Sequence, residues 1–379
     1  MNNTGGRRFG KIELQPSFIG KLLLRASANE RLIRTGALLI LAAGVASLAV
    51  LGVSLIKPGI LGAPGHILQE KASELIQHAF SSGTLKLVAA VAVVIAIDLW
   101  ALGYKNSALN SLLHPDKSTR TDILIFLLGI AGLWRYAIIL SFFAVGYLLE
   151  RQVTGNWGQN WMQLIPSPIV QTLFYLLLYD FLDYWRHRFG HRLSWWWEVH
   201  LYHHAAEKFN IITVGRSHPI DLALTGIFVA MPMAIFGAPI EAFLLIEIFR
   251  SLQGKLQHSM IDWDWGWLGR NVFISPIAHR IHHSPDPIHW DKNYGHIFVF
   301  WDRLFGTWYD GCDVNTNIGL LHNNENKDGF IFELLRGQLR FLGALFSRWD
   351  TKVGVLPENI AREESKRYRE ALAAQTIDA

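Results

Sequence analysis

The chain has 379 residues, of which 51% are apolar and 17% charged, and a formal net charge of +4. Globular proteins carry about 25% charged residues, so this composition favours a membrane protein over two water-soluble domains. The small net charge argues against a nucleic-acid partner. The single cysteine, Cys312, excludes an intramolecular disulfide framework and a zinc–thiolate site.

Residues 1–35 form a basic arm with seven Lys or Arg residues. This arm is too long for a cleavable signal peptide, and the apolar run that follows it is long enough to span a bilayer. Because positive residues favour the cytoplasmic side, we expect the arm to be cytoplasmic.

Four later segments are candidate transmembrane helices. They are residues 36–56, 85–104, 122–149 and 168–185. The third candidate is longer than one span and holds Arg135 near its middle, so it is either a tilted helix or one broken at Gly129 and Gly132.

A fifth apolar segment, residues 220–250, is interrupted by Pro232, Gly237 and Pro239. Proline and glycine break helices, so two half-length helices forming a hairpin within one leaflet fit this segment better than a straight span. With four crossings and this hairpin, every clustered histidine lies on the cytoplasmic side of a bacterial inner membrane or an endoplasmic reticulum membrane.

The predicted fold is therefore all-α. Residues 36–186 form about four transmembrane helices, residues 187–310 carry the functional region with its membrane hairpin, and residues 311–379 are a cytoplasmic tail. The stretch after Val355, ENIAREESKRYREALAAQ, predicts an exposed charged helix. We expect a cytoplasmic helical cap to hold the functional site.

Histidines are concentrated in one third of the chain, because 12 of the 16 lie between His187 and His296. His187 and His191 continue the fourth apolar run at i and i+4, which places them on one helical face. The motif HxxHH occurs at residues 200–204 and again at 279–283. Each motif directs two or three imidazoles toward one point, which is typical of a metal site.

Eight clustered histidines exceed the needs of one ion, since a structural zinc takes four ligands. Two metals are therefore expected. No HExxH motif occurs, which disfavours a zincin protease. A haem protein or a metal transporter would place its ligands inside the spans, and the first three spans contain no histidine.

The chain resembles the fatty acid hydroxylase / sterol desaturase superfamily of integral-membrane di-iron oxygenases. The matching stretches are DFLDYWRHRFGH (180–191), WWWEVHLYHHAAEKFN (195–210), RSHPID (216–221), LQHSMI (256–261), SPIAHRIHHS (275–284) and DKNYGHIFVFWDRLFGTWY (291–309). They fall within residues 180–309, about a third of the chain, and their order is more specific than any one HxxHH.

The resemblance implies ten metal ligands, adding His218 and His258 to the eight motif histidines. The full set is His187, His191, His200, His203, His204, His218, His258, His279, His282 and His283. His289 and His296 are interpreted as residues behind the ligands or beside the substrate.

Catalytic roles are expected for Asp180, Asp183, Asn293 and Tyr294. Metal-bound histidine usually donates its second N–H to a carboxylate or carbonyl, so carboxylates near the site should matter. The candidates are Asp180, Asp183, Asp221, Glu198 and Asp302. The run Trp195–Trp197 is expected to anchor the chain at the membrane interface.

By this resemblance, two iron ions and O2 would hydroxylate or desaturate an unactivated C–H bond of a fatty acyl, sterol or related lipid. The two electrons would come from an external donor, a reductase with a cytochrome or ferredoxin, because no GxGxxG motif or fused haem domain is evident. The alternatives are a zinc-dependent membrane hydrolase and a non-catalytic metal-binding membrane protein. The lipid, the carbon attacked and the role of residues 1–120 stay open.

Overall fold

A computed structural model describes residues 82–133, 161–230, 236–237, 240–310, 317–321, 323, 325–347 and 358–377. Within these ranges the regular elements are helices, and an isolated β-bridge pairs Phe273 with Phe298. The all-α prediction is confirmed for the described part of the chain. The basic arm and the first predicted span, residues 36–56, lie outside it.

The first described helices are α4 (Ser82–Asn106), α5 (Ala108–Leu113) and α6 (Lys117–Ile130). Asp116 caps α6 by accepting a hydrogen bond from the Thr119 N–H at 2.7 Å. The helix ends at Ile130, and Gly132 follows with φ 69°, a left-handed conformation that favours glycine. The third predicted span is thus broken after Ile130, which agrees with the broken-helix alternative.

Two consecutive helices carry five of the predicted ligands. After the 3-10 turn η1 (Trp161–Leu164), α9 runs from Pro168 to Arg192 and α10 from Ser194 to His204. Pro168 starts α9 at a position where its missing N–H costs nothing. Leu193, with extended backbone, separates the two helices.

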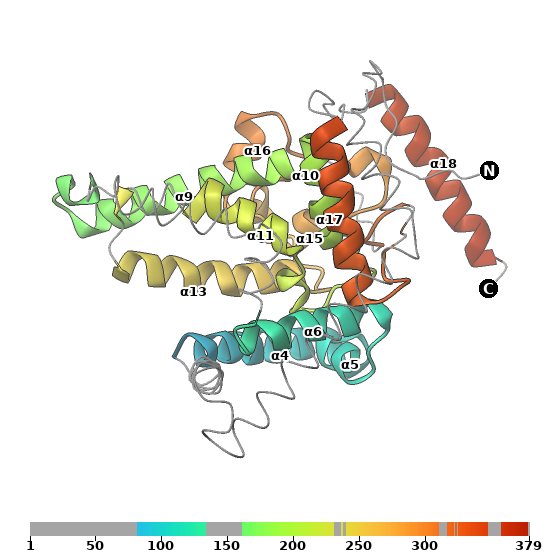
Figure 1. Ribbon diagram of the computed structural model, residues 1–379, viewed down its shortest axis with the longest axis horizontal. Coiled ribbons are helices and arrows are strands. Elements are labelled where there is room, and N and C mark those ends of the chain that lie inside the picture. Colours follow the sequence, from blue (N-terminus) through green and yellow to red (C-terminus); the bar gives the residue numbers. More distant parts are fainter. Residues whose placement is uncertain are drawn as a thin grey trace, which may run out of the picture.

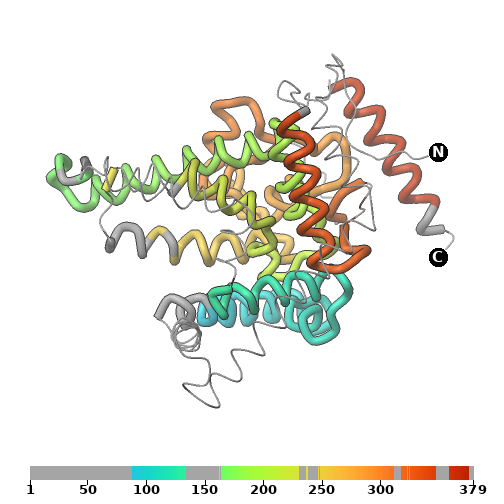
Figure 2. The backbone as a smooth tube through the Cα atoms, in the orientation of Figure 1, coloured from blue at the N-terminus to red at the C-terminus, as the bar shows by residue number. Residues whose placement is uncertain are grey.

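The segment predicted to form a hairpin contains two helical stretches within the described residues, and the hairpin itself stays a prediction. The short turn η2 (Thr213–Gly215) precedes α11 (Pro219–Thr225), which passes into the π-helical turn η3 (Gly226–Ala230). The returning helix α13 (Ile240–Gln257) continues seven residues past the predicted end. Figure 2 shows this return, with the backbone of α13 lying below α9.

The remaining helices surround this frame. They are α14 (Gly266–Asn271), α15 (Pro276–His282), η4 (Pro287–His289), α16 (Phe300–Leu304), α17 (Phe330–Ser347) and α18 (Glu358–Ile377). Helix α17 crosses α10, and α18 lies at the outer edge of the molecule (Figure 1). The charged C-terminal helix predicted from the sequence is confirmed as α18.

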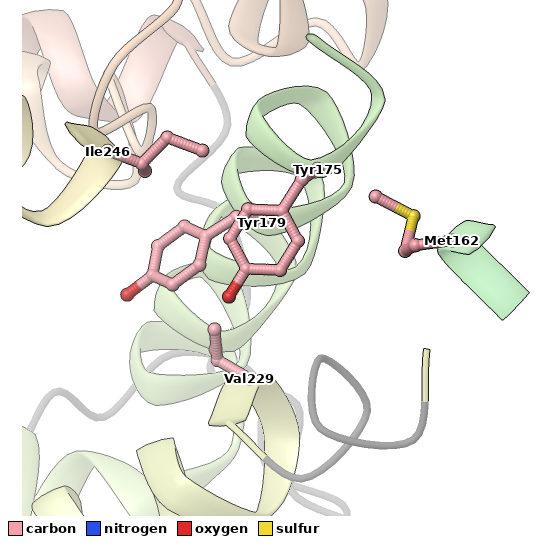
Figure 3. Packing of buried hydrophobic residues seen from close by; sticks show 5 residues of the cluster. All are labelled: Met162, Tyr175, Tyr179, Val229 and Ile246. Atoms are coloured by element: carbon pink, nitrogen blue, oxygen red, sulfur yellow. The ribbon is translucent and has the colours of Figure 1, made fainter. Parts of the chain in front are cut away.

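Helices α4, α9 and α13 extend in the same direction from the centre of the molecule (Figure 1). An apolar cluster fills the space between α9, η3 and α13, where Tyr175 and Tyr179 meet Val229, Ile246 and Met162 (Figure 3). This packing fixes the two long helices against each other and so sets the distance between the histidines at their ends.

In the described residues, one helix is long and apolar enough to cross a membrane by length and composition, Val88–Asn106. It coincides with the second predicted span. The number of spans and the side of the membrane that holds the histidines therefore stay predictions.

Candidate metal centre

Nine of the ten predicted ligands converge. Their ring nitrogens form three overlapping groups in which all ligand atoms lie within 4.8 Å of one another. The groups are His187/His191/His200/His204, His203/His258/His279/His283 and His204/His282/His283. Because His204 and His283 each belong to two groups, the nine side chains form one continuous cluster.

Helical spacing explains most of this convergence. His187 and His191 lie one turn apart on α9, and their rings are 5.2 Å apart between centroids. The HxxHH motif of α10 and that of α15 face each other, with the rings of His204 and His283 stacked at 4.1 Å. His258, directly after α13, completes the second group.

Four of these histidines are oriented by backbone carbonyls. The Nδ1 atoms of His187, His203, His258 and His282 lie 2.8–2.9 Å from the carbonyl oxygens of Tyr294, Arg216, Gly254 and Lys292. A carbonyl only accepts, so Nδ1 carries the proton and Nε2 is left as the ligand atom. Ligating histidines in metalloproteins are held in this way.

The donor set fits metal ions. Two nitrogens each about 2.1 Å from one ion, at 90–110° to one another, lie roughly 3.0–3.4 Å apart. His258 Nε2 lies 3.3 Å from His203 Nε2 and 3.1 Å from His279 Nε2. Buried ring nitrogens of His200, His204 and His283 also have no hydrogen-bond partner among the described residues. Metal ligation would satisfy these atoms.

Burial keeps the cluster neutral. It lowers the pKa of His203, His204, His279 and His283 well below the usual value, and that of His258 to about 4. A proton on one imidazole would repel a proton on the next, and this repulsion lowers the pKa of the first four further. Neutral imidazole is the form that binds metal, so at neutral pH the site is ready for ions without first losing protons.

One predicted carboxylate contacts a ligand directly. Asp221 Oδ2 lies 3.0 Å from His200 Nδ1, and Asp221 Oδ1 accepts a hydrogen bond from the indole N–H of Trp196 at 2.7 Å. Trp196 is fully buried, so the expectation that this tryptophan anchors the membrane interface was wrong. Glu198 instead pairs with Arg340, 3.4 Å away.

Asp302 acts on the site through a loop. Its two oxygens accept hydrogen bonds from the backbone N–H groups of Tyr294 and Gly295 at 2.8 and 2.7 Å, and the Tyr294 carbonyl holds His187. A Cβ at Gly295 would lie 2.6 Å from the Phe298 carbonyl oxygen, so only glycine fits. Burial raises the pKa of Asp302 to about 6.

Asn293 and Tyr294, expected to be catalytic, make hydrogen bonds that tie their loop to its neighbours. Asn293 donates to the Ala278 carbonyl at 3.0 Å and accepts from the Tyr309 N–H at 3.0 Å, which ties the loop to α15. Tyr294 donates its hydroxyl to Asp291 at 2.8 Å, and its ring packs 5.1 Å from that of His191. Both residues hold ligands in place.

The two aspartates expected to be catalytic have different surroundings. Asp180 accepts hydrogen bonds from the N–H groups of Ile297 and Phe298 and from the Trp301 indole, so it fixes the same loop to α9. Asp183 pairs with Arg186 at 2.6 Å and faces His296 at 3.6 Å. Neither belongs to a histidine group.

His218 is a correction to the predicted ligand set. It caps α11: its Nδ1 accepts from the Ile220 N–H at 3.2 Å, and its Nε2 donates to the Leu334 carbonyl at 2.9 Å. Both ring nitrogens are thus engaged by protein, and the side chain lies outside the three groups. His289 and His296, expected near the ligands, also lie outside them; His289 Nδ1 lies 2.9 Å from Ser284 Oγ.

Sequence reasoning missed Arg216, whose carbonyl holds His203. Its guanidinium is fully buried and donates to the Tyr202 carbonyl, to Ser118 and to Asp122, the last at 3.0 Å. Ser118 and Asp122 lie on α6, so the N-terminal helices, which carried no recognised motif, support the second histidine group. A buried Arg within the matching stretch RSHPID was the available signal.

Comparison with known proteins agrees with this geometry. Residues 172–307 match the family model of the fatty acid hydroxylase, a range that contains all nine converging histidines. No solved structure matches the chain significantly.

Curated relatives come from bacteria, animals and plants. The chain is 28% identical over 268 residues to the ornithine lipid hydroxylase OlsE of Rhizobium tropici, covering 70% of this chain and 77% of that protein. It is 34% identical over 213 residues to the alkylglycerol monooxygenase of Caenorhabditis elegans, covering 56% of this chain and 41% of the relative. A very-long-chain aldehyde decarbonylase of rice, GL1-11, is 29% identical over 144 residues, which are 37% of this chain and 52% of the relative.

The chain thus spans about half or less of the animal and plant relatives and most of the bacterial one. The motifs quoted from the sequence, the matching domain and these relatives agree with one another. Residues 172–307, which contain the histidine cluster, therefore match a fatty acid hydroxylase domain, and the chain is similar to members of that superfamily.

Proposed function

We propose that this protein is a membrane-bound oxidoreductase that uses O2, two iron ions and two external electrons to hydroxylate or desaturate a C–H bond of a lipid. One observation carries the proposal: nine imidazoles, eight of them buried, converge within the family domain. The relatives support it, since one is named a lipid hydroxylase and another an alkylglycerol monooxygenase.

The first two of the three histidine groups would each hold one ion. His187, His191, His200 and His204 would hold one ion together with His282, whose ring lies 4.4 Å from that of His187. His203, His258, His279 and His283 would hold the other. Bound iron would supply O2 activation, the chemistry needed to oxidise an unactivated C–H bond.

The protein's own contribution is to fix the ligands and exclude water. Backbone carbonyls orient four imidazoles, and Asp221 orients a fifth. Eight of the nine histidines are buried, which limits access of bulk water to the reacting atoms.

The exposed apolar surface of α9 indicates how a lipid would reach the metal site. The first half of this helix exposes apolar side chains such as Ile169 (73% exposed) and Leu173 (53% exposed), while its last turns carry His187 and His191. In water such a face is costly, whereas in a bilayer it is solvated by acyl chains. We infer that α9 lies in the membrane, that its histidine end is cytoplasmic, and that a lipid reaches the metals laterally.

The test is oxygen-dependent product formation by the iron-loaded protein. With lipid, a reductant and an electron-transfer protein, the proposal predicts an oxidised lipid under air and none under strict anaerobiosis. Product formation that survives anaerobiosis would discard the oxygenase. Stoichiometric zinc with lipid hydrolysis would support the hydrolase alternative instead, and bound metal with neither reaction would support a non-catalytic metal-binding protein.

A further inference from the structure

A group of four ionisable side chains lies between α9 and α13 beside the histidines. Asp183 Oδ1 accepts a hydrogen bond from Arg186 Nε at 2.6 Å, and Asp183 Oδ2 lies 3.8 Å from Arg250 and 3.6 Å from His296. We call Asp183, Arg186, Arg250 and His296 the charged group. It is not used by the metal chemistry, because none of its members belongs to a histidine group.

The charged group lies against both ion sites. Arg186 directly precedes His187 on α9, and Arg250 lies two turns before His258 along α13. His296 borders Gly254, where an added Cβ would lie 3.6 Å from its Nε2, and the Gly254 carbonyl holds His258. The group therefore faces the ends of α9 and α13 at which the two sets of ligands meet.

On its other side the group meets apolar packing. The Arg250 guanidinium stacks on the ring of Tyr179, 4.3 Å from its centroid. Tyr179 belongs to the apolar cluster between α9, η3 and α13 (Figure 3). Along α9 the surroundings thus change from apolar at Tyr175 and Tyr179, to charged at Asp183 and Arg186, to the histidines.

One guanidinium of the group keeps donors that the described residues do not use. Asp183 accepts a hydrogen bond from Arg186 through Oδ1, and its Oδ2 lies 3.8 Å from Arg250. Arg186 donates through Nε alone to the described residues, which leaves its terminal Nη atoms for another acceptor. The nearby Asp221 is engaged by His200 and Trp196.

Keeping such charges away from water requires a reason. The side chains of Arg186, Arg250 and His296 are 13%, 19% and 18% exposed, so they are mostly buried but still reachable. Ionisable residues at membrane depth are costly and usually mark a functional site. A forked guanidinium with free Nη atoms matches a carboxylate or a phosphate, which it binds with two parallel hydrogen bonds.

We infer that the charged group binds the anionic headgroup of the lipid substrate, a carboxylate or a phosphate, and so presents a carbon near the headgroup to the metals. A substrate oxidised in the middle of its acyl chain would need an apolar lining at this place. The inference rests on the proposed lipid oxidation and adds the substrate class and the region attacked.

The test uses anaerobic equilibrium binding to the full-length, iron-loaded protein in neutral detergent. The probes share a palmitoyl chain: N-palmitoylglycine as the carboxylate, palmitoyl lysophosphatidate as the phosphate, and the methyl ester of the first and palmitoylglycerol as neutral controls. We expect at least one anionic probe to bind about tenfold or more tightly than its neutral control. The anionic probe that shows the preference identifies the headgroup as a carboxylate or a phosphate.

Substitutions then locate the preference. Arg186→Gln and Arg250→Gln should each reduce it to about twofold or less, Arg250→Lys should restore part of it, and the exposed Arg303→Gln should leave it unchanged. Equal binding of anionic and neutral probes by the unsubstituted protein overturns the inference. So does a preference that survives both glutamine substitutions.

Iron content is the folding control for each variant. If Arg186→Gln loses iron, the binding preference of Arg250→Gln tests the inference. If both variants lose iron, the comparison of the anionic and neutral probes on the unsubstituted protein tests it. Under air, mass spectrometry should place the new oxygen or double bond near the headgroup, and a mid-chain product contradicts the inference. Such a product leaves the proposed function standing, whereas absence of any oxygen-dependent product from iron-loaded protein removes the proposed function itself.

Discussion

The two histidine groups differ in how far apart their members lie along the chain. The first, His187, His191, His200 and His204, comes from two consecutive helices. The second joins His203 to His258, His279 and His283 and depends on the packing of α10, α13 and α15. Local helix periodicity is enough to assemble most of the first group, while the second needs contacts between distant segments.

Support for the second group reaches beyond the family domain. Arg216 holds His203 through its carbonyl and is itself held by Asp122 on α6, outside residues 172–307. The first group is supported from within the domain, by Asp221 and by the loop that Asp302 fixes. Substitutions far from the metals should therefore affect the two groups unequally.

The largest effect is expected where the groups meet. His204 belongs to the first group and to the group with His282 and His283, so His204→Ala should remove a ligand of the first ion and the ring that stacks on His283, a ligand of the second. Because loss of residues that merely support ligands costs 10–100-fold in metal affinity or activity, loss of this ligand should cost more than about 100-fold. Metal analysis and oxygen uptake would measure it, and full retention of iron would refute the assignment of His204 as a ligand.

His203→Ala should distinguish the two ion sites. His203 belongs to the second group alone, so the variant should lose activity and keep the ion of the first group, about one iron per chain. Iron analysis of the purified variant measures this ratio. A ratio equal to that of the unsubstituted protein would contradict the assignment of His203 as a ligand.

Asp122→Ala should weaken the second group from a distance. It leaves the fully buried Arg216 without its carboxylate, and breaking a buried ion pair costs about 3–5 kcal/mol. Thermal unfolding and iron content should both fall. The matched control is Asp264→Asn, which breaks an exposed pair with Arg270 and should cost about 1 kcal/mol or less. Equal losses in the two variants would argue against the role of Arg216.

Gly295→Ala should disturb the first group through its loop. The added methyl group would meet the Phe298 carbonyl at 2.6 Å and Asp302 Oδ2 at 2.8 Å, and such overpacking costs about 1–3 kcal/mol. Denaturant unfolding would measure the loss. Gly129→Ala on α6 is the control, since nothing lies within 4 Å of its added Cβ. If Gly295→Ala is as stable as this control, the loop does not constrain His187.

The smallest effect is expected at His218. Removing a helix cap costs about 0.5–2 kcal/mol, so His218→Ala should be modestly less stable while keeping its iron. Iron loss comparable with that of His258→Ala would restore His218 to the ligand set.

The sequence predicted the helical class and, through HxxxH and HxxHH, eight of the nine converging histidines, because these spacings place imidazoles on one helical face whatever the tertiary context. The ninth, His258, was implied only by the family resemblance. His218 was misassigned because its pattern, a histidine before a proline that starts a helix, suits a cap as well as a ligand. Only the position of Leu334 and the Ile220 N–H distinguishes the two. The interface role expected for Trp196 failed for a similar reason, since its partner Asp221 is distant in sequence.

Roles that depend on long-range packing could not be read from spacing. Asp180, Asn293 and Asp302 were recognised as important, and in the structure each makes hydrogen bonds with backbone groups of the segments beside the histidines. The links from Asp122 to Arg216 and from Asp183 to Arg250 join helices far apart in the chain, and no periodicity connects them.

Everything depends on whether nine imidazoles bind two ions. The most direct measurement is the iron-to-protein ratio of the full-length protein after anaerobic loading and removal of loosely bound metal. The account predicts about two irons per chain, and about one in each of His203→Ala and His204→Ala, because the two histidines belong to different ion positions. A ratio near zero in the unsubstituted protein, or an identical ratio in all three, would contradict it.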